Sequence, residues 1–236
     1  MDIHKPKPWR GWPEFVKEIG TIVIGVLTAL GAEQVVERIE WGHKVRAAED
    51  AMRLELLNDD GPQVYQRAAM HSCLVGKLDA IRAGVEAGMA RAELSRLIDS
   101  YHLDFLTYDT LAHDDASHAG VAEHMSQKAL DVWTRAYTVM PTMERTNADE
   151  AQALSRLRAL RHSGGPLSEA EQTHVLDAIE ALRVDERNMA NAASWILPYI
   201  RKVGVLDPRR TRLFLADARA WYGSACVQDV PAGWRP

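Results

Sequence analysis

The side chains best suited to bind a metal ion gather in one short stretch near the middle of the chain. They are His113, Asp114, Asp115, His118, Glu123 and His124. Imidazole and carboxylate groups are the ligands that zinc and related divalent ions take from proteins. On a helix, Asp114 and His118 would share a face, so a metal-dependent enzyme is one hypothesis. The spacing does not match His-Glu-x-x-His, and such groups are also typical of exposed turns, so we expect no metal site and no cofactor.

The two cysteines, Cys73 and Cys226, are the next candidates for chemistry. His71 lies two residues before Cys73 on a predicted helix, and residues two apart do not face each other. A nucleophilic Cys/His pair would therefore need a contact from elsewhere in the fold. The cysteines can form a single disulfide if this part of the chain lies outside the cytosol, and would be reduced thiols inside it.

Other polar groups have ordinary explanations. Asn188 and Asn191 lie in the middle of a predicted helix, where they could bind a partner but more often bond one another or face water. Arg209, Arg210 and Arg212 form a small basic patch of the kind found on exposed helix faces. The chain contains no Gly-rich phosphate loop, no Gly-x-Ser-x-Gly and no Cys-x-x-Cys. We therefore expect a protein that is not an enzyme.

The element that positions everything else is the uncharged run Ile19–Ala32. Its 14 residues are fewer than the roughly 20 that a membrane-spanning helix needs. Apolar residues extend the run on both sides, and charged residues near a helix end can reach the interface. We predict a spanning helix over 12–41. A core helix of a soluble bundle and a cleaved signal peptide are the alternatives.

Tryptophans flank this run at positions where a membrane has its interfaces. Trp9 and Trp12 precede it, and Trp41 follows it. A helix from Trp12 to Trp41 would be about 43 Å long at 1.5 Å per residue, which matches the roughly 40–45 Å of a bilayer with its headgroup zones. Aromatic belts of this kind are typical of spanning helices.

One face of the same helix carries small residues. Thr21, Gly25 and Ala29 recur every four positions, with Thr28 and Ala32 beside them. Small residues at this spacing let two membrane helices approach closely. We predict that this face contacts a second helix, from another copy of the chain or from a different protein.

The basic residues suggest an orientation. Lys5, Lys7, Arg10 and Lys17 precede the run, whereas Arg38, Lys44 and Arg46 follow it. Basic residues accumulate on the cytoplasmic side of a membrane. The N-terminus is therefore predicted to be cytoplasmic, and the large C-terminal part periplasmic.

The remainder of the 236 residues reads as helices only, so the predicted fold class is all-α, with the membrane helix continuing into an antiparallel helical bundle. We expect a surface arm at 1–11, the span at 12–41, a bundle at 42–222 and an irregular tail at 223–236. Asn58–Pro62 predicts a break and Pro141 a kink or split, whereas Ser168 to Glu171 is a capping box.

Several side chains define the expected boundaries and buried faces. A third helix is expected over 90–105 with Phe105 inward, a short helix and turn over 107–120, and a last helix opening at Asp207-Pro208. Residues expected to point inward near the C-terminus are Trp195, Leu213, Phe214, Ala218 and Trp221.

A resemblance adds to this interpretation. From Lys17-Glu18-Ile19 to Glu33-Gln34-Val35-Val36-Glu37, the chain resembles an uncharacterised family of bacterial single-span inner-membrane proteins, a domain of unknown function. The segment 107–125 with the long helix after it is similar too. The resemblance implies an architecture and a location in the bacterial inner membrane, and it assigns no functional residue.

Composition and motifs together leave three hypotheses. The net charge of −5, without a strongly basic face, argues against nucleic acid as a partner. The first hypothesis is a membrane-anchored interaction protein, an accessory or scaffolding subunit of an inner-membrane complex or a homo-oligomer. Its partners would be membrane lipid and other membrane subunits or a second copy. The second is a periplasmic small-molecule sensor or binding module, and the third is the metal-dependent enzyme.

Overall fold

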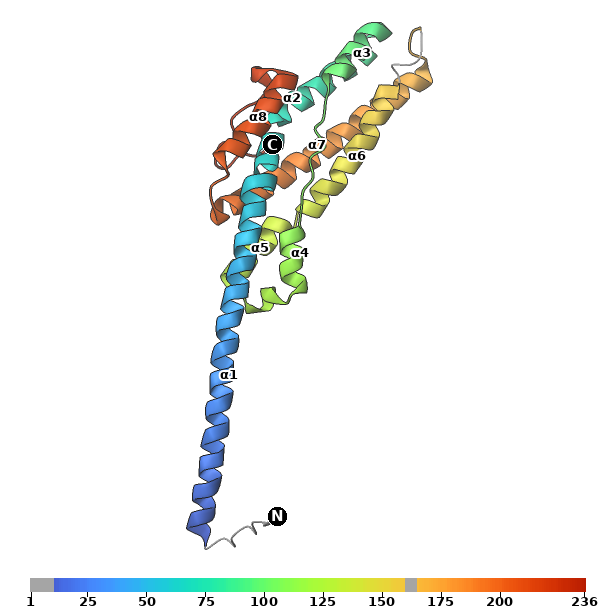
Figure 1. Ribbon diagram of the computed structural model, residues 1–236. Helices are drawn as coiled ribbons and strands as arrows, with labels where there is room; N and C mark the ends of the chain where they lie inside the picture. Colours follow the sequence, from blue (N-terminus) through green and yellow to red (C-terminus); the bar gives the residue numbers. More distant parts are fainter. Residues whose placement is uncertain (1–10, 160–164) are drawn as a thin grey trace, which may run out of the picture. The chain divides into compact units, whose positions relative to one another are not determined.

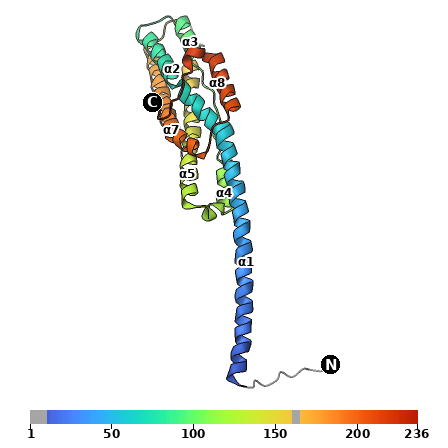
Figure 2. The same cartoon turned by 90° about the vertical axis from the view of Figure 1, so that its left-hand side faces the viewer.

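The fold is all-α over the residues that the computed structural model describes, 11–159 and 165–236. No strand occurs in these ranges, as the composition predicted. The chain divides into two compact units, Met1–Ala47 and Ala48–Pro236. The long helix α1 begins in the first unit and ends in the second. The ribbon is shown in Figure 1 and, turned by 90°, in Figure 2.

The described helices follow one another along the chain in a fixed order. They are α1 (Trp12–Glu55), a π-helical turn η1 (Leu56–Asp60), α2 (Gly61–Glu86), α3 (Arg91–Ser100), α4 (Leu111–His118), a 3-10 turn η2 (Val121–His124), α5 (Gln127–Tyr137), α6 (Met140–Ala159), α7 (Glu169–Val203), α8 (Pro208–Tyr222) and a 3-10 turn η4 (Ser224–Cys226).

The predicted break at Asn58–Pro62 is wrong. The backbone stays helical there because hydrogen bonds between residues five apart replace the α-helical bonds between residues four apart. The Gly61 N–H, for example, donates to the Leu56 carbonyl. Pro62 lies in the first turn of α2, where its missing N–H costs little. A π-turn therefore absorbs the proline that the sequence suggested would end the helix.

A distant residue completes this junction. The Leu57 carbonyl is the one that a π-helical bond from residue 62 would use, and proline has no N–H to give. It accepts instead from the Asp207 N–H at 2.9 Å. Gly61 lets the Leu206 side chain approach, since a Cβ there would clash with it, and a Cβ at Gly204 would lie 2.6 Å from Leu57.

The predicted third helix is shorter than expected. It ends at Ser100, and residues 101–110 are not helical. Tyr101, Leu103 and Tyr108 are buried in this segment, whereas Phe105, expected inward, is exposed. Because the segment is not helical, its backbone N–H and C=O groups need other hydrogen-bond partners, which side chains supply.

Local signals in the second half of the chain are confirmed. Pro141 falls in the first turn of α6, so the long predicted helix is split into α5 and α6. Ser168 accepts from the Glu171 N–H, and the Glu171 side chain accepts from the Ser168 N–H, which completes the capping box of α7. Asp207 caps α8 by accepting from the N–H groups of Arg209 and Arg210.

The core of the second unit lies among α2, α6 and α7. Helix α7 packs against both α2 and α6, and α6 and α7 run side by side in both views (Figures 1 and 2). Large buried side chains from the three helices, such as Leu74, Leu154 and Ile179, meet there. Helix α8 packs on α2, and α5 on α7.

The residues expected to form an irregular tail are part of this unit. Val227 and Val230 are buried, the Gln228 N–H donates to the Ala69 carbonyl at 2.9 Å, and the Val230 N–H donates to the Tyr65 hydroxyl at 3.2 Å. The C-terminal residues therefore pack on α2.

Three large residues expected to be buried are exposed: Trp195, Leu213 and Trp221. Trp221 stacks on His102 at 4.4 Å between ring centroids. Ala218 on the same helix is buried, as its spacing predicted, so the predicted inward face of α8 is right at Ala218 and wrong at Leu213 and Trp221.

Candidate functional sites

The first candidate site is the apolar surface of α1. Its large aliphatic side chains are 43% to 67% exposed: Val16, Ile19, Ile22, Val23, Ile24, Val26, Leu27, Leu30, Val35, Val36 and Ile39. The best 18-residue window has a mean hydropathy of 1.8, and none of it is buried. By length and composition this helix could cross a membrane, and a signal sequence near the N-terminus shares both properties. Monomeric soluble proteins rarely expose so large an apolar patch.

The small residues predicted to form a contact face all lie within this helix. Because α1 is continuous, Thr21, Gly25 and Ala29 share one face at a spacing of four. The Thr21 hydroxyl donates to the Lys17 carbonyl at 2.9 Å, which satisfies it within its own helix. No described atom lies within 4 Å of a Cβ built at Gly25. Thr28 and Ala32 flank the face, and its contact with a second helix stays a prediction.

The structure describes two of the three tryptophans that were predicted at the membrane interfaces. Trp12 opens α1, is exposed, and lies 5.6 Å from Phe15 between ring centroids. Trp41 carries the Lys44 ammonium 4.3 Å from its ring centroid. Trp9 and the predicted arm up to residue 10 lie outside the described residues.

The candidate metal ligands are not assembled into a site. His113 stacks on Tyr137 at 4.9 Å between centroids, and its Nδ1 lies 3.4 Å from Asp114. The Thr110 hydroxyl, which donates to Asp114 at 2.7 Å, lowers the pKa of that carboxyl. His118 ends α4, and His124 lies in η2. Within the described ranges, no group of three or more His, Cys, Asp or Glu side chains could hold a metal ion.

Cys73 and Cys226 form a disulfide, with their Cα atoms 5.1 Å apart. The bridge joins α2 to the C-terminal residues across 153 positions of sequence. His71 does not pair with Cys73 but contacts Glu186, with 3.2 Å between Nδ1 and Oε1. A nucleophilic Cys/His pair is therefore ruled out, and the sulfur atoms serve to hold the fold.

The second candidate site is a buried ion network that sequence reasoning missed. Arg67 of α2 donates from Nη2 to Glu150 of α6 at 2.5 Å and to Glu186 of α7 at 2.8 Å. The three side chains are between 0% and 4% exposed. Glu186 also contacts His71, so one guanidinium links the three central helices of the unit.

A signal for this network was present in the sequence. Each of its charges lies on the apolar face of its helix. Arg67 lies three residues after Val64, and Glu186 lies three before Met189, both of which are buried. A charge at an inward helical position needs a buried partner, so these spacings pointed to an internal ion pair without identifying the partners.

The charges in the network are unbalanced. Burial would lower the pKa of Arg67, but Glu150 and Glu186 raise it well above its usual value, so the guanidinium stays charged. Burial raises the pKa of Glu150, which the proximity of Glu186 raises further and Arg67 counteracts. Two carboxyls thus share one guanidinium, and the pKa of Glu150 is raised to about 7.

Tyrosines surround the network. Burial raises the pKa of Tyr101 and of Tyr108, and both hydroxyls lie within electrostatic range of Arg67. Several buried atoms in the described part of the chain have no hydrogen-bond partner, and four of them belong to this cluster: Arg67 Nε, Glu150 Oε2, Tyr101 Oη and Tyr108 Oη. Because the acidic groups and the guanidinium are closed off from solvent, the cluster is suited to binding a proton and holding the helices together, not to acting on a large substrate.

Polar side chains around the same core hold the non-helical segment 101–110. Asp60 accepts from the Asp109 N–H at 3.1 Å, Glu144 accepts from the Tyr108 N–H at 3.2 Å, and the Asn147 amide donates to the Leu106 carbonyl. Burial raises the pKa of Asp60 to about 8, opposed by its bond to Asp109. The segment thus replaces helical hydrogen bonds with side-chain partners from η1 and α6.

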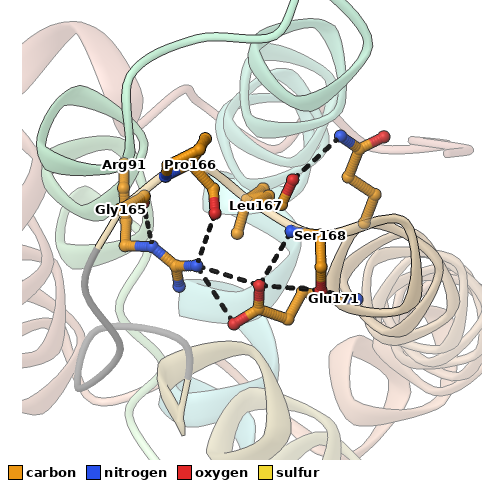
Figure 3. A network of polar contacts seen from close by, with 7 residues as sticks. Arg91, Gly165, Pro166, Leu167, Ser168 and Glu171 are labelled. Carbon is orange, nitrogen blue, oxygen red and sulfur yellow. Dashed lines mark hydrogen bonds and ion pairs between the residues drawn. The ribbon is translucent and has the colours of Figure 1, made fainter.

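A third polar cluster fixes the start of α7 (Figure 3). Arg91 donates to both carboxylate oxygens of Glu171, at 3.0 and 2.9 Å, and to the carbonyls of Gly165 and Pro166. The Ser168 N–H also bonds Glu171, and with Arg91 it lowers the pKa of that carboxyl to about 2. All groups in this cluster are engaged in holding a helix terminus, so it is structural.

The remaining sequence candidates are surface features. Asn188 and Asn191 are both exposed on α7. Arg210 lies 3.6 Å from Asp59, and Arg212 donates to the Pro208 carbonyl.

Comparisons of the chain with protein-family models, with curated proteins and with solved structures found no match. The resemblance to a single-span family therefore stays a prediction, and function has to be argued from the geometry.

Proposed function

We propose that this chain is a single-pass protein of the bacterial inner membrane that acts by binding other proteins and not by catalysis. Residues 12–41 cross the bilayer, and the second unit is a periplasmic antiparallel bundle. The protein is an accessory or scaffolding subunit of a membrane complex, or a homo-oligomer. Its partners are membrane lipid and other membrane subunits or a second copy of itself.

The observation that carries this proposal is the exposed aliphatic surface between Val16 and Ile39. Leaving that surface in water would be costly at about 25 cal/mol per Å² of apolar area. A hydrocarbon environment removes the cost, and because α1 is one continuous helix, the backbone groups beyond its first turn can be bonded within the helix, as a bilayer requires.

The disulfide supports the orientation. Bridges such as Cys73–Cys226 persist in oxidising compartments and are rare in the cytosol. The excess of basic residues before the span points to the same arrangement, with the second unit in the periplasm.

The small face supports a protein partner within the membrane. Thr21, Gly25 and Ala29 would allow close approach of another helix. Purification of the tagged full chain from native membranes in mild detergent tests this directly. The expected result is a stoichiometric partner or a defined oligomer, and a lone monomer at every detergent concentration would contradict the proposal.

A second experiment separates an anchor from a cleaved signal sequence. The intact mass of the chain recovered from the membrane should include residues 1–41. A C-terminal alkaline phosphatase fusion should be active, and the equivalent fluorescent-protein fusion dark. A shortened soluble chain, or the opposite reporter pattern, would overturn the proposed anchor or its orientation.

A further inference from the structure

A groove of about 570 Å³ lies where α7 ends and α8 begins, against α2. Its apolar lining includes Tyr65, Leu197, Ile200 and Leu206. The groove exists because Gly204 ends α7 and three residues later Asp207 caps α8. Its volume falls in the range of about 300–1,000 Å³ that is usual for small-molecule sites.

The lining of this groove is mostly apolar. Val205, in the connection between α7 and α8, is 85% exposed and lines the groove. Thr211 also lines it, but its hydroxyl donates to the Asp207 carbonyl at 2.8 Å and is already satisfied. The uncharged part of the lining therefore favours a hydrocarbon chain over a sugar or a nucleotide.

Two guanidinium groups line the same groove, Arg201 from α7 and Arg212 from α8. Arg201 makes only long contacts, to the carbonyls of Val230 at 3.5 Å and Pro231 at 3.4 Å. Arg212 uses Nε for the Pro208 carbonyl at 3.1 Å. Neither forms an ion pair with any carboxylate of the described residues, so both retain N–H donors and positive charge beside an apolar surface.

We propose that this groove binds a long-chain fatty acid, its hydrocarbon chain on the apolar lining and its carboxylate between Arg201 and Arg212. A guanidinium matches a carboxylate with two parallel hydrogen bonds. At roughly 30 Å³ per methylene, similar to one water in the liquid, a chain of about fifteen methylenes fills about 450 Å³. A groove of about 570 Å³ therefore has room for one such chain, and a free fatty acid, with one chain and one carboxylate, is the proposed occupant. The inference is independent of the proposed membrane partner.

The test uses the full chain in phosphatidylcholine nanodiscs with a diazirine-bearing hexadecanoate as the probe, and maps cross-links by peptide mass spectrometry. Cross-links should fall on Tyr65 or between Leu197 and Arg212. Arg212→Glu should reduce them about tenfold, because a hydrogen bond between charged groups is lost and repulsion replaces it. Arg219→Glu, the same charge change on the same helix outside the lining, should leave them within about twofold.

Competition on the unmodified chain supplies a readout that does not depend on variants. Excess hexadecanoate should displace the probe, and hexadecanol, which lacks the carboxylate, should do so at least about tenfold less well. Cross-links confined to residues 12–41, equal labelling of Arg212→Glu, or equal competition by the alcohol would overturn the proposal. Stronger competition by phosphatidylglycerol would assign the groove to a bilayer lipid instead, and cross-links joining two chains would assign it to a second copy.

Discussion

Arg67 of α2 and Glu150 of α6 form a fully buried ion pair, with 2.5 Å between Nη2 and Oε1. Removing the guanidinium leaves Glu150 and Glu186 without their shared counter-charge. We therefore expect Arg67→Met to lower the free energy of unfolding by about 3–5 kcal/mol, the usual cost of breaking a buried pair. Urea unfolding followed by tryptophan fluorescence measures the loss.

The matched control for that variant is Arg82→Met, also on α2. Arg82 pairs with Glu86 and Glu180, but these side chains are 38% to 57% exposed. Exposed pairs contribute little to stability because solvent screens them, so the control should unfold at nearly the same urea concentration as the wild type. A loss at Arg67 as small as the loss at Arg82 would show that the buried network does not stabilise the unit.

The raised pKa of Asp60 predicts that the stability of the second unit depends on pH. Burial raises its pKa to about 8, with Glu55, Asp109 and Asp59 as the nearby acids. An unfolded Asp titrates near its model value of 3.8, so between about pH 4 and pH 8 the folded state keeps a proton that the unfolded state loses. The contribution of Asp60 to stability must therefore fall as pH rises through this window, by up to about 1.4 kcal/mol per unit.

Asp60→Asn isolates this effect. The amide cannot ionise, and its oxygen can still accept from the Asp109 N–H. The variant should be more stable than the wild type near pH 8 and should show a flatter profile between pH 4 and pH 8. Asp59→Asn removes only the weakest of the acidic influences on Asp60, so it should keep nearly all of the wild-type slope. Parallel profiles for the wild type and Asp60→Asn would contradict the prediction.

The Cys73–Cys226 bridge should contribute about 2–5 kcal/mol, because it closes a loop of 153 positions in the unfolded chain. Urea unfolding of the wild type should shift to lower denaturant when a reductant is present. The double variant Cys73→Ser/Cys226→Ser should start at the lower value and not respond to the reductant. A response in the serine variant would assign the effect to something other than the disulfide.

The start of α7 offers a smaller effect. Ser168 accepts from the Glu171 N–H at 3.3 Å and caps the helix. Replacing such a cap by Ala costs about 0.5–2 kcal/mol, whereas Gly costs only a few tenths. The melting temperature should therefore be highest for the wild type, slightly lower for Ser168→Gly and lowest for Ser168→Ala. Equal melting temperatures for all three would show that the cap does not stabilise α7.

Signals that act within a few residues predicted the fold well. The capping box at Ser168, the Asp207-Pro208 start of α8 and the helix division at Pro141 were all predicted from neighbours in sequence and are confirmed. Each depends on backbone groups at most four positions away. The all-α class follows from such signals.

Features that depend on distant partners were missed. Helix continuity through Pro62 is compatible with the fold because Asp207, far along the chain, bonds the Leu57 carbonyl. The non-helical segment 101–110 depends on side chains such as Asn147. In the same way, the sequence showed charges on inward helix faces but not which ones would meet. A single sequence contains no signal that pairs residues across such distances.

The small face of α1 gives the most direct test of the proposed function. Gly25 lies on it with Thr21 and Ala29, whereas Gly31, six positions on, lies on a different face of the same helix. A Cβ at either glycine meets no described atom within 4 Å, so neither substitution should disturb the chain's own fold. If the face binds another helix, Gly25→Leu should separate the two backbones and weaken association in a bilayer, while Gly31→Leu should leave it unchanged. Energy transfer between labelled chains in vesicles measures a self-association, and co-purification yield measures a different partner. Equal association of both variants and the wild type would remove Thr21, Gly25 and Ala29 from the proposed interface.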